Sequence, residues 1–397
     1  MPSASSAPTQ ALSSQFVLLM ALACGLCAGS AYFNQPLIYS IAKSLGIQTI
    51  QASFAVVIAQ VGYMLGLMLL VPLGDFFNKR KLIVSLMVFA AGSQLLLSMS
   101  NSLTGLYLFT LCATFGAISA QVLIPFASSI SPPQSSAATV GKLMSGLVMG
   151  IILSRSFAGF VSTYWSWQAV YFSSGILTLL LAVLMWYKLP NTKPETRLTI
   201  TDLYASLFSL ARQNPHLLRR AGAGALGFAI LSMVFTSMTF VLGSAPYDFS
   251  DFEIGLFGLL GVIGIYSSSW SGKTVGLGKE NLVAKLCIAL MLLSCVPLYF
   301  AQQSLILYAI GVLMSYFGLT AFHVLNQNLV YRIDSKARSR INAVYMTIYF
   351  SGAALGSLAA VYAWQHYQWF GCVALVLLFG FGILVLDRMD FKSMQQL

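Results

Sequence analysis

Residues 51–100 decide the fold of this chain, and they read QASFAVVIAQVGYMLGLMLLVPL (51–73), GDFFNKRK (74–81) and LIVSLMVFAAGSQLLLSMS (82–100). Two apolar runs of about 20 residues, each long enough to cross a bilayer as a helix, flank a short loop that ends in three bases. A backbone that crosses lipid must satisfy its own hydrogen bonds, so each run is predicted to be an α-helix. The same pattern repeats along the chain in both directions.

The composition agrees with repeated membrane crossing. Of the 397 residues, 58% are hydrophobic and 8% are charged, and the mean hydropathy is +0.82. A soluble domain carries about 25% charged residues, so this is not an ordinary soluble enzyme, a disordered chain or a coiled coil. The net charge of +11 is explained by Lys and Arg in loops, and we expect no nucleic-acid partner. The sequence predicts an all-α polytopic membrane protein in contact with the lipid bilayer.

Twelve apolar runs predict twelve transmembrane helices. They lie at about 14–38, 51–73, 82–100, 104–130, 140–163, 168–188, 217–242, 254–272, 282–300, 304–330, 341–363 and 370–387. We expect the first run to be a retained helix rather than a signal peptide, because no Lys or Arg precedes Lys43 and signal peptides begin with a positive region.

The distribution of Lys and Arg predicts the orientation. Lys43 is the only base in the loops on one side, Arg155 lies inside a span, and the other bases fall in the loops and tail on the opposite side. Cytoplasmic loops collect Lys and Arg. Both termini are therefore predicted to be cytoplasmic, in a multi-pass protein of the inner (cytoplasmic) membrane.

The segment 189–216 divides the predicted spans into two sets of six, in 1–188 and 217–397. Between its prolines, Thr201 and Asp202 precede a row of leucines on one helix face, which predicts a short amphipathic helix at the cytoplasmic surface. A plain charged linker is the alternative.

The two sets resemble each other weakly at an offset of about 200 residues. Gly150 follows the junction of the fourth and fifth spans, and Gly352 follows the junction of the tenth and eleventh in a similar local sequence. A repeat of this kind, with a site at the midplane between the halves, is typical of transporters.

Three stretches carry a family resemblance. VPLGDFFNKR (71–80) matches a Gly-x-x-x-Asp-Arg-x-Gly-Arg-Arg loop at its Asp and at its two terminal bases, and YFNQP (32–36) and RSRIN (338–342) add to the likeness. On these residues the chain resembles the major facilitator superfamily of transporters, in its bacterial drug-efflux-like branch, over nearly its whole length.

The resemblance implies twelve helices in two six-helix halves, alternating access, a monomer as the working unit, and no cofactor or metal. It also implies a cytoplasmic latch between the halves built on Asp75, for which Lys79, Arg80, Arg338 and Arg340 are candidate partners. From the residues alone, a carboxylate at a helix start is stabilised by the helix dipole. The alternative is that Asp75 serves only to set the membrane topology.

None of the ten acidic residues lies in the middle of a predicted span. Many proton-coupled transporters use a membrane-embedded carboxylate. If protons are the coupling ion here, the candidates are His323 and the acidic residues of the periplasmic mouth, Asp248, Asp251 and Glu253. A neutral hydrogen-bonding role for His323 is the alternative.

Arg155 is the most informative single residue, because it lies well inside the apolar run of the fifth span. A charge at mid-bilayer costs about 2.5–3.5 kcal/mol on insertion scales, so Arg155 is expected to face a cavity and to have a partner. Its planar guanidinium suits a carboxylate or a phosphate. We predict a substrate-binding or gating role, with bracing between helices and contact with lipid headgroups as alternatives.

Other polar side chains in the spans are predicted to turn inward. Together with Arg155, the candidate substrate-binding residues are Asn34, Gln121, His323, Asn326, Gln327 and Tyr345. Packing between helices is the alternative for each of them. As a set they indicate an aromatic, mostly neutral cavity with one fixed positive charge.

The sequence therefore predicts a secondary transporter of a small organic solute, with efflux of amphiphilic or drug-like compounds as the first interpretation. The alternatives are an organic-anion transporter that uses Arg155 as its anchor, and a non-transporting membrane sensor. No nucleotide-binding loop is present. An enzyme is not expected, because the three histidines, His216, His323 and His366, lie in separate elements.

Overall fold

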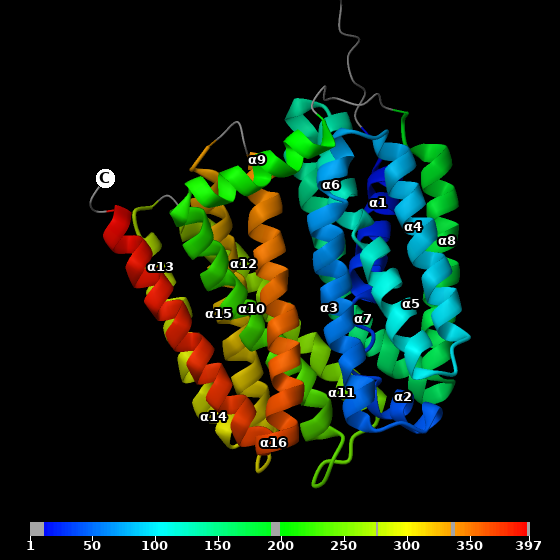
Figure 1. The fold of residues 1–397 in the computed structure, drawn as a ribbon, viewed down its shortest axis with the longest axis vertical. Coiled ribbons are helices and arrows are strands. Elements are labelled where there is room, and N and C mark those ends of the chain that lie inside the picture. The colour runs from blue at the N-terminus through cyan, green and yellow to red at the C-terminus, as the bar shows by residue number, and fades with distance from the viewer. Residues whose placement is uncertain (1–11, 192–198, 275–276, 335–337, 395–397) are drawn as a thin grey trace, which may run out of the picture.

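The computed structural model describes residues 12–191, 199–274, 277–334 and 338–394, whose helices form two sets that stand side by side (Figure 1). All regular elements in these ranges are helical, which confirms the expected all-α fold. We call the set formed by α1–α8 the N half and the set formed by α10–α16 the C half. α9 (Ile200–Gln213) lies between them in the sequence.

The N half contains eight α-helices and one 3-10 turn. These are α1 (Ser14–Ser30), α2 (Ile38–Leu45), α3 (Thr49–Leu69), η1 (Pro72–Asp75), α4 (Lys79–Ser98), α5 (Leu103–Ala117), α6 (Ser119–Ile130), α7 (Pro133–Tyr164) and α8 (Trp167–Lys188). Ser102 and Ser166 begin α5 and α8 by accepting a hydrogen bond from a first-turn N–H. Serine suits this position because the first four N–H groups of a helix have no partner in the helix.

The C half contains seven α-helices and one 3-10 turn. These are α10 (Pro215–Leu242), α11 (Asp251–Leu256), η2 (Phe257–Val262), α12 (Ile263–Thr274), α13 (Glu280–Leu293), α14 (Cys295–Tyr299), α15 (Leu305–Tyr331) and α16 (Arg338–Met394). α11, η2 and α12 follow one another directly, so that a 3-10 turn stands in the middle of one membrane segment.

Ten segments of the described residues are long and apolar enough to cross a membrane. The predicted spans 341–363 and 370–387 both lie in α16, whose 57 residues far exceed the roughly 20 that a bilayer core of about 30 Å requires. The backbone leaves the helical conformation at Gln368 (φ 53°, ψ −151°), and Figure 1 shows α16 as two arms that meet near its label. α1 has only 17 residues. The polytopic membrane fold is confirmed, and the count of twelve spans stays a prediction.

Small residues hold the central helices of each half in close contact. In the N half, an added Cβ on Gly150 of α7 would overlap the backbone of Gly25 on α1. In the C half, an added Cβ on Gly352 of α16 would overlap the backbone of Ala225 on α10. Helix backbones approach this closely only where side chains are small. Gly150 and Gly352 thus occupy corresponding places in the two halves.

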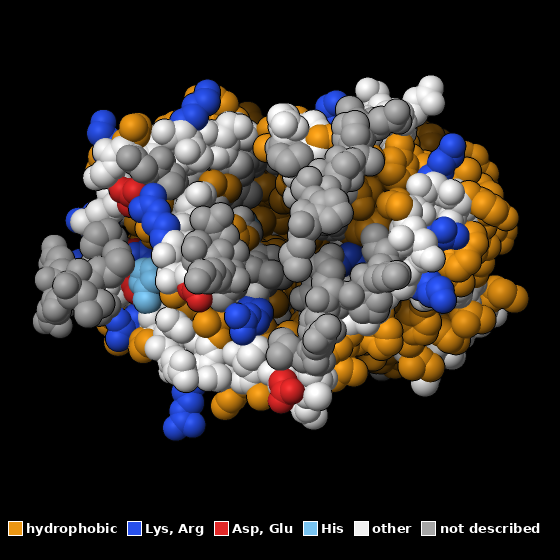
Figure 2. Space-filling model, turned by 90° about the horizontal axis from the view of Figure 1, so that it is seen from above, with side chains coloured by type: hydrophobic (Ala, Val, Ile, Leu, Met, Phe, Trp, Pro, Cys, Tyr) orange, Lys and Arg blue, Asp and Glu red, His pale blue; other side chains and the backbone are white. Residues whose placement is uncertain are grey.

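The two halves meet at one end of the molecule and separate at the other. At the end that carries α2 and α11, here called the α2 end, α7 of the N half packs against α11 and η2 of the C half. We call the opposite end, where α9 lies, the basic end, because Lys and Arg side chains surround it in Figure 2. Figure 2 also shows a hollow between the halves at this end, with hydrophobic side chains inside it.

α9 connects the two halves at the basic end. Its first turn is closed by a capping box between Thr199 and Asp202, and it contacts α10 and α16 of the C half. The Tyr204 hydroxyl donates a hydrogen bond to the backbone oxygen of Leu69, the last residue of α3, at 2.6 Å. Partial burial raises the pKa of Tyr204.

We predict that Gly150→Ala destabilises the protein, because the new methyl group overlaps the α1 backbone, which cannot move aside as a flexible side chain would. Overpacking of this kind costs about 1–3 kcal/mol. The measurement is the free energy of unfolding in an SDS titration of the purified protein.

Gly92→Ala in α4 is the matched control, since its added Cβ meets nothing within 4 Å. Alanine is the better helix former by about 1 kcal/mol, so this variant is expected to be as stable as the wild type or more so. Equal stability of the two variants would contradict the close contact between α1 and α7.

Candidate functional site

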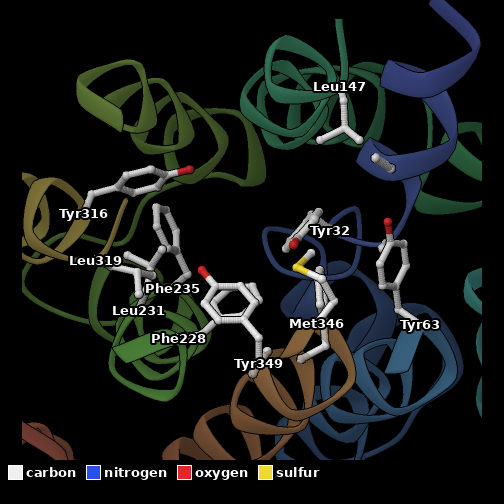
Figure 3. Packing of buried hydrophobic residues seen from close by; sticks show 14 of the residues in the cluster. Tyr32, Tyr63, Leu147, Phe228, Leu231, Phe235, Tyr316, Leu319, Met346 and Tyr349 are labelled. Carbon is white, nitrogen blue, oxygen red and sulfur yellow. The ribbon is translucent and has the colours of Figure 1, made fainter. Parts of the chain in front are cut away.

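Arg155 lies on α7 where the N half faces the C half. Only 3% of the residue is exposed. Aromatic rings from both halves surround the same region, and Figure 3 shows them directed toward a shared central space. We call this group the central cluster. It consists of Arg155, Tyr32, Tyr63, Phe228, Phe235, Tyr316, His323, Tyr345 and Tyr349.

The guanidinium of Arg155 is oriented by polar groups of the N half. Its Nε donates to Oε1 of Gln35 at 2.6 Å, and Nη1 donates to the backbone oxygen of Ile151, one turn earlier, at 3.3 Å. Its Cζ lies 4.9 Å from the ring centroid of Tyr32 and 4.2 Å from that of Phe235. Contacts of a cation with a ring face contribute about 2 kcal/mol or more when desolvated.

The positive charge of Arg155 has no carboxylate partner in the described part of the chain, where the ion pairs join other residues. A buried charge is strongly unfavourable unless it is paired. One amide, one carbonyl and two rings orient the guanidinium and leave its net charge uncompensated. The electrostatics therefore favour an anionic group bound beside Arg155.

Two glycines, Gly255 and Gly258, allow the C half to reach this part of α7. Gly255, Gly258, Gly261 and Gly264 recur every third residue through η2, and a 3-10 helix has three residues per turn, so they share one face. An added Cβ on Gly258 would lie 2.8 Å from the Cβ of Arg155 on α7. An added Cβ on Gly264 would lie 2.6 Å from the Tyr316 ring, so the later glycines pack against α15 within the C half. This spacing of glycines is a signal in the sequence that the sequence analysis did not use.

His323 forms part of the C-half wall of the central cluster. Its Nδ1 lies 3.1 Å from the Tyr345 hydroxyl, and its ring centroid lies 4.2 Å from that of Tyr349. Tyr345 is buried, and His323 is half-buried. The structure thus brings together two of the predicted site residues, His323 and Tyr345, in the C half, whereas Arg155 lies on the N-half side of the central cluster at Phe235.

Two further predicted residues are half-buried at the edge of the central cluster. Gln121 on α6 donates to the Tyr63 hydroxyl at 3.3 Å, and Gln327 on α15 contacts Sδ of Met346 at 3.8 Å. Each amide has groups left over for a further hydrogen bond.

The two predicted asparagines lie inside their own halves. Asn34 donates to the backbone oxygen of Ala55 at 3.2 Å and accepts from the Tyr171 hydroxyl. Asn326 is fully buried, and it exchanges hydrogen bonds with the side chain and backbone of Arg220 at 3.5 and 3.4 Å. Both amides are thus engaged by protein groups and brace helices in this structure.

The predicted latch lies only partly within the described residues. The side chains of Asp75 and Arg338 lie outside them. Arg80 stacks over the Trp186 ring at 4.4 Å and reaches the backbone oxygen of Leu189 at 3.5 Å, both in the N half. Lys79 is half-buried and Arg340 is exposed. The latch between the halves stays a prediction.

A second group of buried charges, near the basic end, was not predicted. By sequence, Arg220 belongs with the bases predicted for the loops, and Asp387 and Asp390 lie at or beyond the end of the last predicted span. Arg220 is 1% exposed and pairs with Asp387 at 2.9 Å and Asp390 at 2.6 Å on α16. His216 joins Asp390 at 2.6 Å. Both carboxylates are buried although they lie at or beyond the end of the last predicted span, because residues three apart on α16 share a face that packs against α10.

Asp251 bridges the two halves at the α2 end. It is 7% exposed, and its carboxylate accepts hydrogen bonds from the hydroxyls of Ser162 on α7, at 2.6 Å, and Ser40 on α2. Of the other acidic residues predicted at this mouth, Glu253 caps its own helix through Ser250, and Asp248 is exposed. Asp251 is therefore a hydrogen-bonded contact between the two halves at the α2 end.

These features define a class of protein. The two helical halves meet at one end, separate at the other, and face each other across a buried polar and aromatic site. This is the structure of a membrane transporter. The chain belongs to the Major Facilitator Superfamily, whose sequence model matches residues 20–357.

Relatives identified by sequence are also named as transporters. The chain is 39% identical over 368 residues to the putative uncharacterized transporter YgaY of Escherichia coli (strain K12), with 92% of this chain and 93% of the relative covered. It is 29% identical over 370 residues to a probable transporter of Streptomyces coelicolor, with 92% and 85% covered.

Solved structures share the fold at low sequence identity. A bacterial homolog of the human lysosomal transporter Spinster, in an inward-facing and occupied conformation, matches with a TM-score of 0.74 at 12% identity, over 99% of this chain and 98% of that one. The human organic anion transporter MFSD10 matches with a TM-score of 0.67 at 13% identity, over 94% and 98%.

We predict that Arg220→Met strongly destabilises the C half, because it leaves Asp387 and Asp390 buried without their arginine partner. Removal of one member of a buried ion pair costs about 3–5 kcal/mol. The free energy of unfolding in an SDS titration measures this loss.

Arg332→Met provides the comparison, since it breaks the exposed pair between Arg332 and Glu280, with N···O 3.2 Å. Exposed pairs contribute about 0–1 kcal/mol. If Arg220→Met and Arg332→Met lowered the free energy of unfolding by the same amount, the buried ion pairs of Arg220 would not stabilise the C half more than an exposed pair does.

Proposed function

We propose that the protein is a secondary active transporter that exports a small amphiphilic organic anion across the inner membrane by alternating access. The observation that carries this proposal is the guanidinium of Arg155, which is 3% exposed, lies between the halves and has no carboxylate partner among the described residues. An anion at this position compensates the buried charge, and the guanidinium fork matches a carboxylate or a phosphate.

The aromatic surroundings of Arg155 support an amphiphilic solute. Phe228 stacks on Tyr349 with ring centroids 4.5 Å apart, and Phe235 meets Tyr316 edge to face at 5.9 Å. Sites for small organic ligands combine such apolar walls with a few placed polar groups. The anionic group is assigned to Arg155, and the apolar body of the solute to these rings.

The direction of transport is inferred from charge and from the arrangement of the halves. The basic end carries the Lys and Arg side chains (Figure 2), and cytoplasmic loops are rich in these residues. In this orientation both termini are cytoplasmic, and the hollow at the basic end admits a solute from the cytoplasm. Release then requires the α2 end to open after the basic end closes.

Two solved structures with this fold agree with the proposal. MFSD10 is titled an organic anion transporter, and the Spinster homolog is titled inward-facing and occupied. At 13% and 12% identity they share the fold alone with this chain. They support the proposal by showing that the fold accommodates such a solute and such a state.

Export of neutral or cationic drug-like compounds is the second candidate, because the same rings would bind an uncharged aromatic compound. A lipophilic cation would meet the like charge of Arg155 in a site of low dielectric constant, where repulsion is strong. The structure thus favours anions over cations.

We predict that Arg155→Gln abolishes the binding of organic anions and spares the binding of neutral compounds. A ligand at about 100 times its Kd stabilises the folded state by about 2.7 kcal/mol. Thermal unfolding of the purified protein in detergent, with 1-naphthoate, 1-naphthalenemethanol and tetraphenylphosphonium as probes, measures this stabilisation.

Two controls separate charge from geometry. Arg212→Gln removes the same charge from the exposed surface of α9 and is expected to bind as the wild type does. Arg155→Lys keeps the charge but loses the planar fork, so intermediate anion binding is expected. The anion proposal would fail if the cation or the alcohol stabilised the wild type and Arg155→Gln equally and the anion stabilised neither. The second candidate function would then replace it.

Protons are the proposed coupling ion, with His323 as the proposed protonated group. An imposed pH gradient is then expected to drive accumulation of 1-naphthoate in proteoliposomes beyond the passive uptake of the neutral acid by protein-free liposomes. His323→Gln is expected to remove this excess while leaving exchange of the anion in place. Gradient-driven transport by His323→Gln would contradict the role of His323. Ligand binding without any flux would favour a sensor.

A further inference from the structure

Gln35 is the residue through which the anchor Arg155 touches the α2 end. It lies in the turn between α1 and α2 and is 1% exposed. Its side-chain Oε1 accepts from Nε of Arg155 at 2.6 Å, and its backbone oxygen accepts from the Thr239 hydroxyl at 2.5 Å. Arg155 belongs to the N half and Thr239 to α10 of the C half. One residue therefore contacts both the charge and the opposite half.

The chain that follows Gln35 makes the closing contacts of the α2 end. Tyr39 on α2 packs against Gly243, where an added Cβ would overlap its ring. Ser40, the next residue, donates to the Asp251 carboxylate. Because α2 begins only three residues after Gln35, a displacement of Gln35 is transmitted to the contacts of α2 with the C half.

The bonding of the guanidinium leaves one side of it for a ligand. Nε is held by Gln35 and Nη1 by the backbone oxygen of Ile151, while no acceptor among the described residues holds Nη2. An anion that binds at Nη2 draws the guanidinium toward itself. The hydrogen bond from Nε then transfers this force to Gln35.

We propose that Gln35 is a positioning residue that orients Arg155 and couples anion binding to closure of the α2 end. The proposal rests on the function proposed above, in which Arg155 binds the anion. By linkage, if closure of the α2 end alters anion affinity through Gln35, anion binding alters the closed population by the same factor. The Thr239–Gln35 bond is the part of this connection that crosses between the halves.

The first test measures the α2 end directly. Spin labels at Lys43→Cys on α2 and Gln302→Cys before α15, both exposed positions, report the distance between the halves in a background whose native cysteines are replaced by alanine. Thr239→Val removes the hydroxyl that donates to Gln35. Loss of one hydrogen bond worth about 1 kcal/mol is expected to raise the open-to-closed ratio about fivefold, in the absence of any ligand.

Thr236→Val is the matched control, because Thr236 lies on the same helix, is equally buried, and donates to Ser357 within the C half at 3.1 Å. It is expected to leave the distance distribution unchanged. Thr239→Ser keeps the hydroxyl and is expected to restore the wild-type distribution, which a purely structural effect of the substitution would not do.

The second test measures the anchor. Gln35→Glu places a carboxylate at the position that contacts Nε of Arg155, so it is expected to weaken 1-naphthoate binding at least tenfold while sparing 1-naphthalenemethanol. Gln168→Glu adds the same charge on α8, where Gln168 donates to the Ser44 hydroxyl at 3.3 Å, and serves as the control for an added negative charge at the α2 end.

The outcomes separate the two proposals. If Thr239→Val matches Thr236→Val in the distance distribution while anion binding still depends on Arg155, the coupling through Gln35 is wrong and the anion proposal stands. If Arg155→Gln keeps full anion affinity, the anion proposal fails, whatever Thr239→Val does. If Thr239→Val raises the open population but the protein binds no anion, Gln35 contributes to closure of the α2 end and does not couple that closure to a ligand.

Discussion

A guanidinium buried without a carboxylate partner is the constraint on which the centre of this structure depends. Arg155 is stabilised by the faces of Tyr32 and Phe235 and by hydrogen bonds to Gln35 and Ile151. Tyr32, Gln35 and Ile151 belong to the N half and Phe235 to the C half, so one face of the charge is covered by protein only while the halves are close together at its level. Any movement of one half past the other changes the surroundings of this charge, which makes the site sensitive to conformation.

The two buried arginines show how similar residues acquire different roles. Arg220 is enclosed by Asp387, Asp390 and Asn326, all within the C half, so its charge is neutralised inside one rigid body. Arg155 is held by neutral groups at the boundary between two bodies. A charge neutralised within one half does not change when the halves move, whereas a charge at the boundary can respond both to a ligand and to the movement.

Hydrophobic runs and the positions of Lys and Arg were sufficient to predict the polytopic all-α fold, because lipid permits little else for such segments. The prediction that Arg155 has a functional role also followed from the properties of lipid, in which a charged side chain is strongly unfavourable. Contacts between helices distant in the sequence could not be predicted in this way: Arg220 resembles a loop base until α16 packs beside α10, and Gln35 resembles any polar residue of a turn. The glycines at every third position of η2 did carry a readable period, but a 3-10 turn is rarely expected within a membrane segment.

Those glycines have a consequence for the membrane as an electrical barrier. Gly255 and Gly258 bring the C half so close to α7 that not even a methyl group fits between them and Arg155, so the two segments are in direct van der Waals contact there and leave no gap for a file of water molecules. Water files conduct protons, and each elementary charge that crosses the membrane dissipates about 2.3 kcal/mol per 100 mV. The contact between α7 and the α11–η2 segment thus blocks proton conduction through the closed end. The hollow at the basic end then does not dissipate the membrane potential.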